Sequence, residues 1–179
     1  FGAALTRARQ AAIDSPRMGL LNKCVLRFDR IHWPGDVDWI GWLGPRPGFW
    51  GEWVSLAHTM AVPVLIGFNA ADPATEIEGM SDRDTRTAAQ DALRAMFGTG
   101  FPAPLDSQIT RWGQEPLSRG SYSYNAVGTG PTTRRALAGS DWNGQLWFAG
   151  EACSVGHFGT AHGAVLTGRE VAQAILKDG

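Results

Sequence analysis

One stretch near the end of the chain constrains the fold more than any other part of the sequence. Residues 145–176 read QLWFAGEACSVGHFGTAHGAVLTGREVAQAIL. An apolar run typical of a strand ends at Gly150 and Glu151, a turn with two further glycines follows, and an alanine-rich helical pattern begins near Thr160. This order predicts a strand, a turn and a helix N-terminus held close together, as in loops that bind the phosphates of a nucleotide.

The sequence contains no complete nucleotide-binding unit of its own. The one formal match to G-x-G-x-x-G/A is formed by Gly98, Gly100 and Ala103. It follows a helical pattern instead of a strand, and Pro102 and Pro104 exclude a helix that opens there. A dinucleotide fingerprint needs a strand before it and a helix after it. We therefore expect the AMP-binding half of any such site to lie upstream of this sequence.

Apolar and β-forming residues alternate in several segments between Gly and Pro residues, which predicts a meander of strands. The segments span residues 22–31, 37–44, 52–58, 63–70, 106–113 and 145–150. Residues 118–139 read as a long ordered loop. Consecutive strands with two substantial helices predict an α+β fold.

The two helices are recognised because their apolar residues recur at helical spacing and no longer alternate as in a strand. In residues 82–97, one stripe is formed by Thr85, Ala88, Ala89, Ala92, Leu93 and Met96. Ser81 can cap this helix and Gly98 can end it. The closing helix is predicted from about Thr160 to Lys177. Its inner face is predicted to carry Ala164, Gly168, Val171, Ala172 and Ile175.

The composition excludes several classes of function. The chain has 16 Lys and Arg against 17 Asp and Glu, without a basic run, which argues against a nucleic-acid partner. No stretch approaches the ~20 apolar residues that span a membrane. The first residues have neither an initiator Met nor the features of a signal peptide. We expect the chain to be a piece of a longer protein.

The cysteines and histidines lack the spacing of a metal site. Cys24 and Cys153 form no CxxC, and the four histidines form no HxxxH or HExxH. We predict two buried thiols, no metal and a cytoplasmic location.

Three motifs resemble the flavin-containing amine oxidase family. LWFAGEACSVGHFGTAHGAVLTGREVAQAI (146–175) resembles the family's C-terminal "FAGE" turn and the helix after it. MGLLNKCVLRFDRIHW (18–33) is similar to the family's lysine-bearing strand, and ITRWGQEPLSRGSYSY (109–124) to its "TRW…GSYSY" segment. The motifs stand in the family's order. Their residue pattern is closer to the polyamine oxidase and lysine-specific demethylase branch than to the monoamine oxidase branch.

The resemblance implies two domains and a flavin. Residues 1–125 would form part of a substrate-binding domain with a mixed, mostly antiparallel sheet and flanking helices. Residues 126–179 would be the returning strand and helix of a Rossmann-like FAD-binding domain whose N-terminal part is absent. FAD would be bound in the intact protein. The missing N-terminal half and a small-molecule amine are the expected partners, and a homo-oligomer stays open.

The resemblance gives Lys23 the catalytic role of holding a water beside flavin N5. A compact ammonium is suited to fixing one water against a ring nitrogen, although an isolated Lys on a strand is ordinarily a solvated edge charge. Gly150 and Glu151 match the turn that contacts the flavin tail. Thr160 and Ala161 match the start of a helix whose positive end can stabilise charge at flavin N1 and C2=O, and Thr160 is also a good N-cap.

Further residues match the family near the flavin ring and the substrate. Trp112 and Tyr122 match positions close to the ring, although buried Trp and Tyr residues are more often core residues. His157 and Phe158 occupy the turn that faces the substrate in the family. His157 is either a substrate-binding residue or a solvated turn residue, and the sequence leaves both open. Thr160 stands where many relatives have a Tyr that completes an aromatic cage around the amine.

Five tryptophans are grouped densely in the first half of the chain. They either pack between the sheet and the helices or line an entry groove, and packing is the favoured interpretation. The five are Trp33, Trp39, Trp42, Trp50 and Trp53.

The implied function is the oxidation of an amine to an imine, with hydride transfer to flavin N5 and reoxidation by O2 to H2O2. One alternative is an L-amino-acid oxidase, in which Arg111 or Arg119 would hold a carboxylate. Another is a fragment without FAD that is catalytically inert alone.

Overall fold

The computed structural model describes residues 3–15 and 17–178, and the chain divides into two compact units. The terminal unit consists of Phe1–Gly19 and Tyr122–Gly179, and the sheet unit consists of Leu20–Ser121. The expected domain boundary at Asn125 is near this division, but the first 19 residues lie with the C-terminal segment. The assignment of the two segments as substrate and FAD domains stays a prediction.

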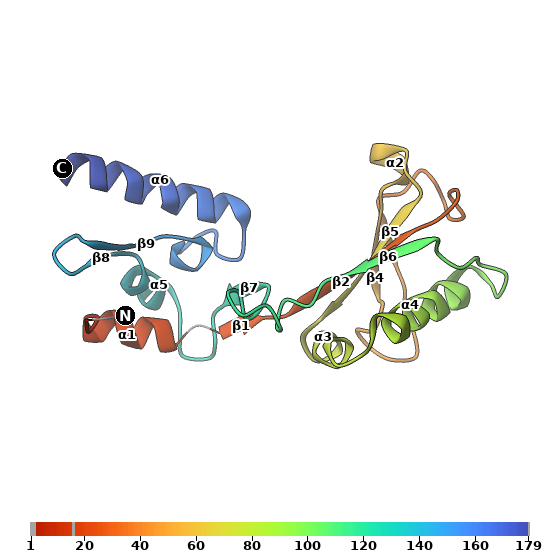
Figure 1. The fold of residues 1–179 in the computed structure, drawn as a ribbon, viewed down its shortest axis with the longest axis horizontal. Helices are drawn as coiled ribbons and strands as arrows, with labels where there is room; N and C mark the ends of the chain where they lie inside the picture. Colours follow the sequence, from red (N-terminus) through yellow and green to blue (C-terminus); the bar gives the residue numbers. More distant parts are fainter. Residues whose placement is uncertain (1–2, 16, 179) are drawn as a thin grey trace. The chain divides into compact units, whose positions relative to one another are not determined.

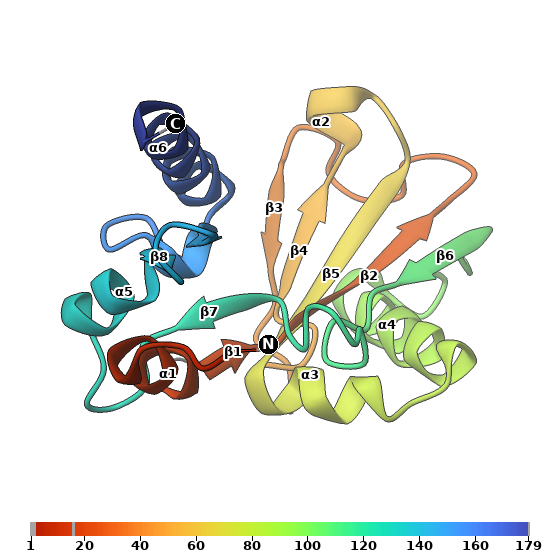
Figure 2. The same ribbon diagram turned by 60° about the vertical axis from the view of Figure 1, so that its left-hand side comes forward.

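The sheet unit contains a five-stranded antiparallel sheet with the order β3-β4-β5-β2-β6 (Figure 2). The strands are β2 (Leu21–Arg27), β3 (Trp39–Gly41), β4 (Glu52–Ser55), β5 (Val64–Ala70) and β6 (Asp106–Ile109). The predicted strands are confirmed, although most end earlier than predicted. Burial alternates along β2, so that Asn22, Cys24 and Leu26 face the core while Lys23 and Val25 lie on the opposite face.

Three helices complete the sheet unit (Figure 1). They are α2 (Ala57–Met60), α3 (Ala71–Glu78) and α4 (Asp82–Phe97). The predicted cap of α4 is confirmed, because Ser81 Oγ accepts a hydrogen bond from Asp84 N at 3.1 Å. The helices α3 and α4 pack on the face that holds Leu26, where Ile77 and Leu93 join the core. The other face of the sheet carries Lys23.

The five tryptophans divide between the core and the surface. Trp33, Trp50 and Trp53 are buried in the core, and Trp42 packs against it. The favoured packing role is confirmed for these four. It is wrong for Trp39, whose side chain is 62% exposed on the face of the sheet opposite the helices.

The terminal unit is built from short strands and three helices. Its elements are α1 (Arg7–Asp14), β1 (Arg17–Gly19), β7 (Tyr122–Tyr124), α5 (Pro131–Leu137), β8 (Gly139–Asp141), β9 (Leu146–Phe148), the 3-10 helix η1 (Glu151–Cys153) and α6 (Ala161–Asp178). Antiparallel pairs join β1 to β7 and β8 to β9. The mixed α+β fold class is confirmed.

Two predictions for this unit are corrected. Residues 118–139 are not a continuous loop, because β7 and α5 lie within them, and Pro131 at the first position of α5 is the helix signal that was missed. The buried line of α6 contains Gly163 and Thr167, whereas Ala172 and Ile175 are exposed. The terminal unit covers only part of one face of α6. The alanine-rich stripe therefore did not identify which residues of the helix are buried.

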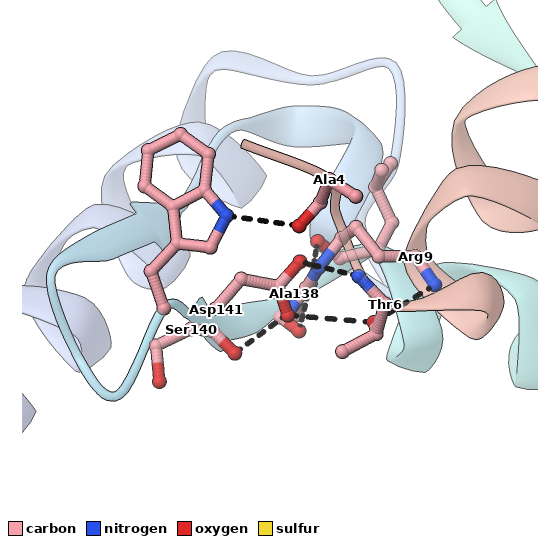
Figure 3. A network of polar contacts seen from close by, with 8 residues as sticks. Ala4, Thr6, Arg9, Ala138, Ser140 and Asp141 are labelled. Carbon is pink, nitrogen blue, oxygen red and sulfur yellow. Dashed lines mark hydrogen bonds and ion pairs between the residues drawn. The ribbon is translucent and has the colours of Figure 1, made fainter. Parts of the chain in front are cut away.

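A buried ion pair ties α1 to β8, more than 120 residues later (Figure 3). Arg9 Nε lies 3.5 Å from Asp141 Oδ2, and both side chains are almost fully buried. The Arg9 guanidinium also donates to the backbone carbonyls of Leu137, Ala138 and Ser140. The N-terminal helix is therefore an integral part of the terminal unit.

Candidate functional site

The Glu151 carboxylate joins three parts of the terminal unit. Its Oε1 accepts from Ser123 N at 2.9 Å, and its Oε2 accepts from Ser123 Oγ at 2.8 Å and from Gly159 N at 2.5 Å. The hydrogen bonds run to β7 on one side and to the turn before α6 on the other. Glu151 is thus a fixed, half-buried acceptor that sets the shape of the turn.

Gly150 is held against α6 by one hydroxyl. Gly150 N donates to Thr167 Oγ1 at 3.0 Å, and the same hydroxyl lies 2.9 Å from Gly150 O. Gly150 has a φ of 135°, which a residue with a Cβ rarely adopts. The sequence predicted the glycine turn but not its contact with Thr167.

Thr160 caps the start of α6, as predicted. Its Oγ1 accepts from Gly163 N at 3.1 Å and donates to His157 O at 2.6 Å. A Cβ at Gly163 would lie 2.0 Å from His157 O, so only glycine fits there. The N–H groups of Ala161 and His162 have no acceptor within the helix. The cap therefore leaves two N–H groups at the positive end of α6 for other acceptors.

The other predicted residues of this unit lie around the same turn. The half-buried ring of Tyr122 on β7 is near Gly159. Phe158 is 37% exposed, and His157 is exposed with its ring centroid 4.6 Å from that of His162. The terminal unit thus brings together every predicted flavin or substrate residue except Lys23 and Trp112.

Arg134 is a buried residue beside this turn that the sequence did not identify. Its Nη1 donates to Ser123 Oγ at 2.9 Å and to Ala152 O at 3.0 Å, and its Nε donates to Asn125 Oδ1 at 2.8 Å. Its Cζ lies 3.9 Å from the centroid of the Phe158 ring. Burial lowers the pKa of this guanidinium, whereas the nearby Glu151 carboxylate raises it. Arg134 was missed because it lies in α5, within the segment predicted as a loop.

Lys23 and Trp112 lie together in the sheet unit. Lys23 N donates to Thr110 Oγ1 at 2.8 Å, and Trp112 N donates to Asn22 Oδ1 at 3.1 Å. Thr110 Oγ1 also donates to Asn22 Oδ1 at 3.2 Å, so the two backbone segments are coupled. The Lys23 side chain is half-buried, and Trp112 is 39% exposed.

The sheet unit also has a cavity of about 380 Å³ on its helix-covered face. Trp42 and Phe49 form its aromatic wall, and Ala88, Ala92 and Ala95 of α4 form the opposite wall. Since Lys23 points to the other face of the sheet, this cavity is separate from the predicted catalytic residue.

The described residues contain no group of three His, Cys, Asp or Glu side chains arranged to hold a metal ion. Within residues 3–15 and 17–178, no helix is both long enough and apolar enough to cross a membrane.

Comparison with known proteins gives a consistent family. A sequence model described as flavin containing amine oxidoreductase matches residues 1–176. Protein FLOWERING LOCUS D of Arabidopsis thaliana is 38% identical over 161 residues, covering 86% of this chain and 20% of that protein. Probable polyamine oxidase 4 of Arabidopsis thaliana is 34% identical over 173 residues, covering 97% of this chain and 34% of that protein.

Among solved structures, the chain is similar in fold to a putrescine oxidase. Wild-type putrescine oxidase bound to putrescine has a TM-score of 0.76 at 19% identity, over 96% of this chain and 38% of that chain. This chain therefore spans about a third or less of the two curated relatives and 38% of the structural one. Because the family's sequence model matches nearly every residue, the chain belongs to the flavin containing amine oxidoreductase family.

Proposed function

We propose that the chain is the C-terminal part of an FAD-dependent amine oxidase, which converts an amine to an imine that then hydrolyses. The observation that carries this proposal is the family match over residues 1–176, because it includes both units. The named relatives support amines as the substrate class, since they are a polyamine oxidase and a putrescine oxidase.

The residues of the terminal unit fit a flavin. Apart from its two neighbours in the chain, no described residue has an atom within 4 Å of the position that a Cβ at Gly150 would take, so a ligand can approach the backbone there closely. The N–H groups of Ala161 and His162, which have no acceptor within α6, suit an electron-rich ring edge. FAD, when bound, accepts the hydride equivalent at N5 and passes the electrons to O2, which gives H2O2.

The chain's own residues would orient the flavin and the amine and would stabilise the negative charge that develops during the reaction. Glu151 keeps the turn in shape through Ser123 and Gly159, so that Gly150 and the start of α6 present their backbone groups together. The positive end of α6 stabilises negative charge that develops beside it. Lys23 would hold a water beside the flavin through its ammonium. The amine reacts as the neutral base, because protonation removes the lone pair that assists C–H cleavage.

The test uses the full-length protein with FAD bound. We expect amine-dependent H2O2 formation and anaerobic bleaching of the flavin absorbance. Lys23→Met should slow flavin reduction or reoxidation while FAD stays bound. Lys177→Met, which removes an exposed ammonium in the last turn of α6, is the matched control.

Several outcomes would contradict the proposal. If flavin-loaded protein oxidises L-amino acids but no simple amine, the amino-acid oxidase alternative is correct. Half-reaction rates of Lys23→Met equal to those of the control would remove Lys23 from the site. If the full-length protein binds no flavin, the proposed chemistry is wrong. A colourless, folded protein made of residues 1–179 alone would favour the alternative, a fragment without FAD that is catalytically inert alone.

A further inference from the structure

The cavity on the helix-covered face of the sheet unit has the size of a small-molecule site. Its volume of about 380 Å³ falls within the ~300 to 1,000 Å³ that is typical of ligand pockets. Its lining comes from the loop between β3 and β4 and from the helices α3 and α4. Among the lining residues, Trp50, Ile77 and Ala92 are buried, whereas Pro45 and Asp91 are exposed. The cavity therefore runs from the core of the unit to its surface.

The walls of this cavity suit a flat aromatic ring. Trp42, Phe49 and Trp50 contribute three aromatic rings to the lining, and aromatic rings pack favourably on one another by offset stacking or edge contacts. The opposite wall, on α4, includes Ala92 and Ala95, which contribute only methyl groups. A ring between these walls would bury both of its faces against apolar atoms.

Arg46 shows which kind of charged group the mouth of the cavity accepts. The Cζ of its guanidinium lies 3.6 Å from the centroid of the Phe49 ring. Its Nη1 and Nη2 donate to Glu76 Oε1 and Oε2 at 3.0 and 2.8 Å. A flat cation is thus held here by one ring face and one carboxylate. The Arg46 and Glu76 side chains are 59% and 50% exposed, so the pair lies at the surface and does not fill the buried part of the cavity.

The charges of the lining favour a second cation over an anion. The charged lining residues are Arg46, Glu76 and Asp91. Among the described residues, Asp91 makes an ion pair only with Arg94, at 3.6 Å, and both of these side chains are largely exposed. Such an exposed pair contributes little, so the Asp91 carboxylate can exchange it for a ligand. An anion would instead meet two carboxylates and one guanidinium that is already paired.

We propose that this cavity binds a compact aromatic molecule with a flat, positively charged head group, such as an aryl amidine or an aryl guanidine. The ring lies between the aromatic wall and α4, and the head group pairs with Asp91. The site is on the face of the sheet opposite Lys23, so it is distinct from the proposed site of amine oxidation. Binding there does not depend on the proposed oxidase function.

The experiment titrates the full-length, FAD-loaded protein with benzamidine, benzamide and benzoate in a calorimeter. The three probes have the same ring and nearly the same shape, but their head groups are positive, neutral and negative. Benzamidine has no C–H bond next to its nitrogens, so it cannot react as an amine substrate. We expect benzamidine to bind with a Kd of ~0.1 to 1 mM. Benzamide should bind ~3- to 10-fold more weakly, and benzoate should show no saturable binding.

Variants that reduce the volume of the cavity test where benzamidine binds. Ala92→Leu fills the cavity from α4 and should abolish saturable binding. Thr87→Leu adds the same side chain at an exposed position of α4 outside the cavity and should keep the wild-type affinity. Ala95→Leu narrows the cavity from an exposed position and tests the site if Ala92→Leu impairs folding. Circular dichroism and flavin absorbance show whether each variant is folded and loaded.

A second pair of variants tests the charge of the head group. Asp91→Asn should weaken benzamidine binding by ~2- to 5-fold and leave benzamide binding unchanged. Asp36→Asn removes an exposed carboxylate of the same unit that is not in the lining, and it should change neither affinity.

Three outcomes would overturn the inference. If the wild type binds none of the three probes, the cavity is not a site for this class of ligand. Benzamidine binding that survives both Ala92→Leu and Ala95→Leu would lie elsewhere on the protein. Benzoate binding as tight as that of benzamidine would exclude the cationic head group. A flavin-loaded wild type that binds benzamidine in the cavity but oxidises no amine would contradict the proposed function and leave this inference standing.

Discussion

At the scale of single residues, burial determines the chemistry of the two thiols. Cys24 is 1% exposed, and burial raises its pKa to about 12, with a further contribution from the Asp82 carboxylate. Burial also raises the pKa of Cys153. The prediction of two buried, unpaired thiols is confirmed. Both remain protonated at neutral pH and are poor nucleophiles.

The raised pKa of Cys24 makes stability depend on pH. The unfolded thiol ionises near 9.0 and the folded thiol near 12, so the folded state holds its proton more tightly. The stabilisation is complete below pH 9 and is lost as the pH rises towards 12. Between pH 8 and 10, the wild type should lose about 1 kcal/mol more unfolding free energy than Cys24→Ala. Urea denaturation at both pH values measures this difference, and equal losses would contradict it.

Residue roles were predictable only where a motif carries them. Glu151 and Thr160 were found from the sequence, and their hydrogen bonds fit a structural role in the turn. Arg134 was not found, because an arginine in a polar segment is ordinarily exposed. Its burial depends on Ser123, Asn125 and the Ala152 carbonyl, which only the folded terminal unit brings to it.

At the scale of elements, strong local signals gave correct predictions. The helix α4 has a clear 3.6-residue period, a serine cap and a terminal glycine, and its bounds match the prediction. The helix α5 has seven residues with arginines near its end, which is too short for a period to be recognised. The inner face of α6 was predicted only in part. The buried residues follow the contact of the turn at Gly150 with Thr167 and not the alanine stripe.

The two glycines of α6 give opposite predictions. Gly163→Ala would place a Cβ 2.0 Å from His157 O, so we expect a loss of ~1 to 3 kcal/mol in unfolding free energy. Gly168→Ala meets no atom within 4 Å and should stabilise the helix by ~0.5 to 1 kcal/mol. Urea denaturation of both variants checks this contrast. Similar effects of the two substitutions would show that the contact with His157 O is unimportant.

Gly163 and Gly168 differ in what surrounds them. A glycine in this pattern often permits a close approach of two backbones, and that is the case for Gly163. No atom of the described chain approaches Gly168 in that way. The same residue type in one motif thus has a packing reason at one position and none at the other.

At the scale of the whole molecule, contacts distant in sequence define the two units. The terminal unit contains both ends of the chain, and the Arg9–Asp141 pair is the polar centre of their contact. Thr6 adds to it, since its N and Oγ1 donate to the Asp141 carboxylate at 3.3 and 3.4 Å. Losing one partner would leave the other charge buried and unpaired.

Arg9→Met should therefore destabilise the terminal unit selectively. Removing one partner of a buried pair costs ~3 to 5 kcal/mol, because the Asp141 carboxylate remains buried. Hydrogen exchange should become faster in α1 and β8 while β2 and β5 keep their protection. Arg46→Met breaks the exposed pair with Glu76 and is the control, with a much smaller effect expected. Equal acceleration in both variants would contradict a structural role for Arg9.

The sequence by itself determined the elements with strong local periodicity, the cap and the glycine turn of α6, and the family. These features follow from backbone preferences and side-chain spacing over a few residues. The tertiary structure alone decided that the N-terminal helix belongs with the C-terminal segment, that Arg134 is buried, and that Lys23, Phe68 and Glu52 lie opposite one another on neighbouring strands. The physical reason is that strand register and buried charge depend on partners far away in the chain, which no local pattern contains.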